Sequence, residues 1–108
     1  MNKKIEFDYE GKHYTLEYNR NSVALMERQG FVVDEFAKKP MIMLPLAFEG
    51  LFYKNHKSES REKIEEIYDK MKDKENLMKT IADMLNETYT SLRDEPTEKE
   101  GNISWKIL

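Results

Sequence analysis

The sequence predicts an α+β fold in which an N-terminal β-hairpin packs on a small bundle of four to five helices and the chain is mostly helical. Two observations lead to this fold class. In the first 18 residues apolar and polar side chains alternate, which is the period of a half-buried strand. Further along, apolar residues recur at spacings of three and four, which is the period of an amphipathic helix. We expect one domain over residues 1–95 and a linker-like tail with an apolar end over residues 96–108.

The hairpin is expected over residues 3–19. Apolar side chains alternate with polar ones in segments 5–9 and 14–18, and Gly11 between them can adopt the positive φ angle of a tight turn. A two-stranded hairpin is only marginally stable by itself. Its apolar face should therefore pack against the helices.

Two short helices are expected next. The first covers about residues 21–29, with Asn21 or Ser22 as its N-cap, and Gly30 ends it in a left-handed turn. The second covers residues 34–38 and ends before a proline, because the residue that precedes proline disfavours helical angles.

The next helix, at about residues 45–55, should be the buried central helix. Pro45 suits the first turn of a helix, where its missing N–H costs nothing. Gly50 inside the helix lowers helix propensity by about 1 kcal/mol relative to alanine. Contacts with the rest of the fold must therefore stabilise this helix.

The second half of the chain predicts two amphipathic helices, at about 60–72 and 74–93. Ser58 or Ser60 is the expected N-cap of the first, and Asp73 that of the second. An alternative is one continuous helix, because five apolar residues lie seven apart: Ile64, Met71, Met78, Leu85 and Leu92. Since two of the four companion positions of this seam are polar, a helical hairpin is favoured over the long helix.

Composition and charge exclude several function classes. The 108 residues carry a net charge of -3 and contain no cysteine, so we expect no nucleic-acid partner, no disulfide and no thiolate metal site. The most apolar run, residues 40–48, is much shorter than the roughly 20 residues that span a membrane. Acidic residues interrupt the basic N-terminus, so we expect neither secretion nor a membrane partner.

No reaction is evident from the residues. His13 and His56 are the only histidines, and they stand far apart in the sequence without cysteine partners. The four glycines form neither a phosphate-binding loop nor a dinucleotide fingerprint, and no nucleophile elbow is present. We therefore expect no enzyme, no catalytic residues, no metal and no cofactor.

The function class that is left is the binding of other proteins, and two apolar segments are candidate binding sites. The first is a methionine-rich stretch around Pro45, which suits the accommodation of a partner helix because methionine is flexible and polarizable: Met41, Met43, Leu44 and Leu46. The alternative, that they fill the core beneath the hairpin, is favoured for any single one of them.

The second candidate is the apolar end of the tail. Its alternate residues Ile103, Trp105 and Ile107 could add as a strand to the edge of a sheet, either this chain's own hairpin or another chain's. The sequence leaves open which of the two accepts it. The hairpin edge and the heptad seam are both compatible with a homo-oligomer.

Five segments that shape the fold form a combined pattern: 5–18 (IEFDYEGKHYTLEY), 26–31 (MERQGF), 40–41 (PM), 48–53 (FEGLFY) and 100–105 (EGNISW). Together they resemble a family of short proteins from tailed phages and prophages of Gram-positive bacteria, the tail assembly chaperones of long-tailed phages. The likeness spans nearly the whole chain.

The resemblance implies a non-enzymatic protein of the bacterial host cytoplasm that is absent from the mature virion. Such a chaperone binds the long helical tape measure protein, keeps it soluble and recruits tail tube protein subunits. A longer form made by ribosomal frameshifting is common in such families, and a protein sequence does not address it. The alternative function is a small structural tail or connector subunit of the phage particle, which would use the hairpin edge to form rings.

Overall fold

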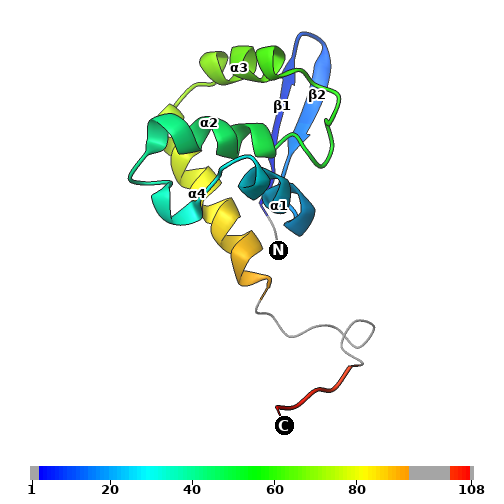
Figure 1. Cartoon of the computed structure of the whole chain (residues 1–108). Helices are drawn as coiled ribbons and strands as arrows, with labels where there is room; N and C mark the ends of the chain where they lie inside the picture. The colour runs from blue at the N-terminus through cyan, green and yellow to red at the C-terminus, as the bar shows by residue number, and fades with distance from the viewer. Residues whose placement is uncertain (1–2, 93–102, 108) are drawn as a thin grey trace.

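The computed structural model describes residues 3–92 and 103–107, and it confirms the α+β fold class. A two-stranded antiparallel hairpin is followed by four α-helices and one 3₁₀ turn (Figure 1). Helix α2 runs through the middle of the molecule, with α3 on one side and α1 and α4 on the other. Within the described residues, no helix combines the length and the apolar character needed to cross a membrane.

The hairpin consists of β1 (Ile5–Tyr9) and β2 (Lys12–Leu16), joined by a two-residue loop. Both loop residues have positive φ, 50° at Glu10 and 78° at Gly11, which is the turn that matches the natural twist of a hairpin. Phe7 lies opposite Tyr14, and their rings stack with centroids 5.1 Å apart. Contacts within the hairpin itself thereby help to order its apolar face.

Helix α1 (Arg20–Arg28) begins slightly earlier than expected, because Asn19 caps it and not Asn21 or Ser22. The Ser22 N–H donates to Oδ1 of Asn19 (2.7 Å), and the Asn19 N–H donates to Oγ of Ser22 (2.9 Å). This reciprocal pair satisfies two backbone donors at the helix start. Gly30, at φ 105°, follows the helix end as expected.

The expected helix 34–38 is instead a 3₁₀ turn, η1 (Val33–Glu35), and the central helix α2 covers Pro40–Gly50 in place of 45–55. Pro40 takes the favoured first position, so Pro45 lies inside the helix. Turns with hydrogen bonds between residues three apart follow the helix through Tyr53. The chain therefore continues to turn nearly to residue 55, where the helix was expected to end.

The core surrounds α2. Gly50 lies so close to α1 that a Cβ atom there would be 2.2 Å from the sulfur of Met26. Rings from α2 and the following turn pack in the same region, with Phe48 and Phe52 at 5.4 Å and Tyr14 of β2 beyond them. The glycine therefore lets α1 and α2 approach each other, which explains its place in a helix.

Helices α3 (Arg61–Lys70) and α4 (Lys74–Thr90) are separate, so the continuous helix is wrong. Ser60 caps α3, and Asp73 caps α4 from a left-handed conformation at φ 53° that no continuous helix allows. The expectation of a helical hairpin is also only partly right. The chain breaks where expected, but α3 and α4 do not pack side by side, since α2 lies against both of them (Figure 1).

Candidate functional site: an apolar groove between α2 and α3

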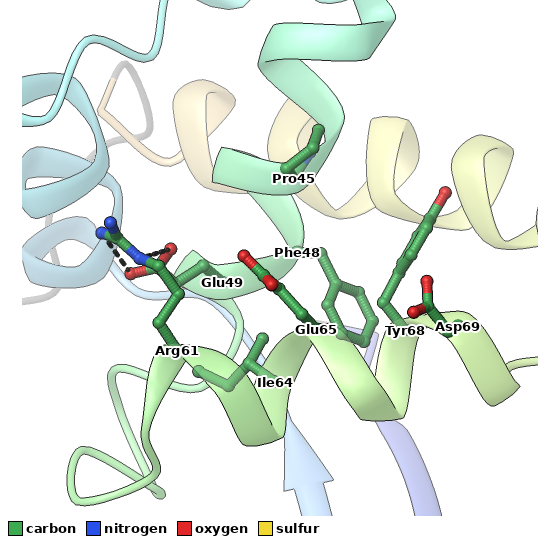
Figure 2. A pocket seen from close by; sticks show the side chains of 8 residues that line it. All are labelled: Pro45, Phe48, Glu49, Arg61, Ile64, Glu65, Tyr68 and Asp69. Atoms are coloured by element: carbon green, nitrogen blue, oxygen red, sulfur yellow. Dashed lines mark hydrogen bonds and ion pairs between the residues drawn. The ribbon is translucent and has the colours of Figure 1, made fainter.

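A groove of about 290 Å³ opens where α3 crosses α2. Figure 2 shows side chains of α3 directed towards those of α2 across this space. Eight residues line the groove: Pro45, Phe48, Glu49, Arg61, Ile64, Glu65, Tyr68 and Asp69. We call this feature the α2–α3 groove.

The floor of the α2–α3 groove is apolar and aromatic. Ile64 and Tyr68 are four residues apart, which places them on the same face of α3. Tyr68 meets Phe48 of α2 edge to face, with ring centroids 5.2 Å apart and planes at 67°. Pro45 presents its ring on the opposite wall (Figure 2). Such a floor favours an apolar side chain from a partner.

The rim of the α2–α3 groove is charged and predominantly negative. At one end, Nε and Nη2 of Arg61 each lie 3.2 Å from a carboxylate oxygen of Glu49, a two-point ion pair that raises the pKa of the guanidinium. Glu65 and Asp69 line the other side and form no ion pair with any other described residue. The lining thus combines three carboxylates (Glu49, Glu65 and Asp69) with one guanidinium (Arg61), so its net charge is negative beside an apolar floor.

The methionine-rich stretch divides between surface and core. Met41 is 89% exposed on the first turn of α2, and its neighbour Ile42 is exposed as well. Met43 is 5% exposed and belongs to the core, as in the alternative that these residues fill it. Leu44 and Leu46 are half-buried against the core. The division follows from the helical start at Pro40, because positions 43 and 47 then face the core.

The apolar end of the tail is exposed in the structure. Ile103, Trp105 and Ile107 have exposed fractions of 81%, 82% and 89%, and the residues between them are exposed too. The linker-like stretch expected at residues 96–102 lies outside the described residues, as does Leu108.

The two histidines have local structural partners. His13 lies on the polar face of the hairpin, with Nδ1 2.7 Å from a carboxylate oxygen of Asp8. His56 is half-buried, and its Nε2 accepts the N–H of Thr15 (3.1 Å). Burial lowers the pKa of His56, which favours the neutral acceptor form. In the residues that the structure describes, no group of three or more potential ligands could hold a metal ion.

Comparison with known proteins identifies the family. A family model described as "Domain of unknown function (DUF5055)" matches residues 1–108. The chain belongs to this family. No curated protein and no solved structure matches the chain. The family description assigns no activity, so a function must be argued from the surfaces described above.

Sequence reasoning missed the α2–α3 groove as a site. The spacing of Ile64 and Tyr68 was available in the sequence, but it indicated only the buried stripe of an amphipathic helix. Glu65 and Asp69 stand among the lysines of the same helix, which is the ordinary pattern of a solvated, charged face. The groove forms because α3 crosses α2 at Pro45 and Phe48. No sequence motif links these two helices, so the contact between them was not predictable.

Proposed function

We propose that this protein is a non-enzymatic phage tail assembly chaperone that binds the tape measure protein and assists tail tube assembly. The observation that carries the proposal is the α2–α3 groove, an apolar surface with a negative rim, next to the exposed Met41 turn. The resemblance of segments 5–18, 48–53 and 100–105 to such chaperones gives the proposal its class of partner.

The α2–α3 groove suits one face of an amphipathic helix. In this mode of recognition, apolar side chains at spacings of three and four enter a groove on the partner. The volume of about 290 Å³ holds only one or two such side chains, so Met41 and Ile42 would extend the contact along the first turn of α2. Methionine adapts to different partner residues, as a long helix without a fixed motif requires.

The charges of the rim select among helices. Glu65 and Asp69 attract a helix that carries Lys or Arg beside its apolar stripe, and they disfavour acidic helices. The chain's net charge of -3 also keeps a complex with an apolar partner in solution. The partner that we propose for the groove is therefore an amphipathic helix of the tape measure protein that carries basic residues beside its apolar stripe. It would be bound in the host cytoplasm and released before the virion is complete.

Co-expression with the tape measure protein encoded beside this gene tests the proposal. The chain should increase the soluble fraction of the tape measure protein and co-purify with it. A double variant, Glu65→Lys with Asp69→Lys, should reduce co-purification because it reverses the charge of the rim. Glu75→Lys with Asp83→Lys, two exposed positions on α4, makes the same change in charge away from the groove and is the matched control, which should have no effect. No gain in solubility and no co-purification would contradict the function, whereas equal binding by all variants would contradict the groove as its site.

A further inference from the structure

The two outer edges of the hairpin differ. The edge of β2 is covered by the segment that follows α2: the Thr15 N–H donates to His56 (3.1 Å), and the Thr15 carbonyl accepts the side-chain amide of Asn55 (3.1 Å). The next outward N–H, that of Glu17, donates to the carbonyl of Leu51 (3.4 Å). The backbone groups on this edge therefore have partners within the chain.

The edge of β1 has no such cover among the described residues. In an antiparallel pair, residues alternate between those that bond to the partner strand and those that point away from it. Tyr9 and Lys12 close the two-residue loop as a bonded pair, so Glu6 and Asp8 direct their N–H and C=O groups outward. Thr15, which lies opposite Glu6, points outward on the other side, as its bonds to residues 55 and 56 show. The β1 edge can thus accept another strand.

The end of the tail has the pattern of such a strand. Ile103, Trp105 and Ile107 alternate with Ser104 and Lys106, and all five residues are exposed. If the three apolar side chains continue the half-buried face of β1, then Lys106 lies on the opposite face. That face of β1 carries the carboxylates of Glu6 and Asp8. Polarity and charge therefore agree on both faces of the pair.

We infer that residues 103–107 of one chain pair with β1 of a second copy and form a third strand of its sheet. The tail of each chain is exposed and does not lie on its own hairpin, and each chain carries both a tail and an open edge. Reciprocal exchange then gives a closed dimer in which the same contact occurs twice. This inference concerns self-association and does not depend on the proposed chaperone function.

The connection between body and tail permits the exchange. Lys3, just before β1, bonds to Asp83 and Glu87 of α4, so the open edge starts near the last turns of the helix that leads into the tail. The ten residues 93–102 can extend to roughly 33 Å. A tail can therefore reach a neighbouring hairpin while both folded bodies stay intact.

Trp105 offers a direct measurement because it is the only tryptophan of the chain. Its emission should shift to shorter wavelength as the concentration of the purified full chain rises, in step with a mass that doubles from 12.9 kDa by light scattering. Emission typical of exposed tryptophan, with monomer mass at all concentrations, would overturn the inference. A shifted emission in a monomer at all concentrations would also overturn it, because the tail would then dock on its own chain.

A mixing experiment identifies the two halves of the contact. One chain carries Glu6→Pro, which removes an outward N–H of β1 but no bond to β2, and the other carries Ile103→Ser, Trp105→Ser and Ile107→Ser. For each variant by itself, the dissociation constant of the dimer should be at least about tenfold higher than for the native chain. Mixed, they should form a heterodimer in which the tryptophan emission of the first chain shifts. Independent chains in the mixture, or undiminished self-association of the serine variant, would overturn the inference.

A charge exchange covers the case in which the proline variant does not fold. The pair Glu6→Lys and Asp8→Lys should weaken the dimer by repelling Lys106, and adding Lys106→Glu should restore it. Equal dimer stability in the native chain, the double variant and the triple variant would show that the acidic face of β1 does not contact the tail. Because no tape measure protein is present in these assays, their outcome is independent of the chaperone proposal.

Discussion

Replacing Gly50 with alanine should destabilise this fold, although alanine is the better helix former. At the end of α2, the added Cβ atom would lie 2.2 Å from Sδ and 2.4 Å from Cγ of Met26. Met26 is fully buried on α1 (0% exposed), so its side chain has no solvent-filled space to move into. The contact between α1 and α2 must therefore adjust.

The magnitude follows from two opposing effects. Alanine gains about 0.5–1 kcal/mol of helix propensity over glycine. Overpacking a filled core costs about 1–3 kcal/mol. We expect Gly50→Ala to lower the free energy of unfolding by about 1–2 kcal/mol, which corresponds to a melting temperature lower by roughly 4–16 °C for a domain of this size.

Urea and thermal unfolding, followed by circular dichroism, measure this effect in two backgrounds. Met26→Ala alone should cost about 2–5 kcal/mol because it leaves a cavity. In that background, Gly50→Ala should become neutral or stabilising, since the Cβ atom then has room. A melting temperature that rises on Gly50→Ala in the native background would refute the reasoning. So would an equal loss in both backgrounds, because the two residues would then not be coupled.

Three further predictions concern other parts of the structure and are checked by the same unfolding measurements. Ser60→Ala should cost about 1 kcal/mol through loss of the N-cap of α3, whereas Ser58→Ala should have almost no effect. Met43→Ala should cost about 2–5 kcal/mol and Met41→Ala less than about 0.5 kcal/mol, because only Met43 is in the core. Burial lowers the pKa of His56, so the imidazole takes up a proton less readily in the folded chain than in the unfolded chain. Stability should be complete above about pH 6.5 and fall below it, and His56→Gln should reduce that dependence.

Local chemistry was predictable where neighbouring residues decide it. Strict alternation over residues 5–9, the loop glycine at 11 and the cap at Asp73 each specify a conformation through the chain's own backbone. The hairpin and the break between α3 and α4 therefore followed from the sequence. The end of α1 was predictable for the same reason, because Gly30 readily adopts the positive φ angle that ends a helix.

The start of α2 was not predictable in this way because two prolines compete for it. Pro40 and Pro45 both suit a first helical turn, and the sequence gives no preference between them. Packing decides for Pro40, which places Met43 and Ala47 in the core and leaves Met41 in solvent. The distribution of the methionine-rich stretch between surface and core depends on that one choice of starting residue.

The α2–α3 groove and the uneven hairpin edges depend on contacts between distant segments. Asn55 and His56 cover the edge of β2 although they lie about 40 positions further along the sequence. No residue near Thr15 indicates this contact. The tail is different, since its alternation of apolar and polar residues was evident in the sequence. Only the structure shows that, within residues 3–92 and 103–107, the edge of β2 is covered and the edge of β1 is not.

Quantitative mass spectrometry of phage particles tests the central claim most directly. The proposed function places this gene in a phage or prophage, so particle production should be induced in the host that carries it, and tail assembly intermediates and finished virions should be purified separately. A chaperone should be present in the intermediates together with the tape measure protein and absent from the virions. A fixed copy number of this chain in finished virions would contradict the account and favour a structural tail or connector subunit.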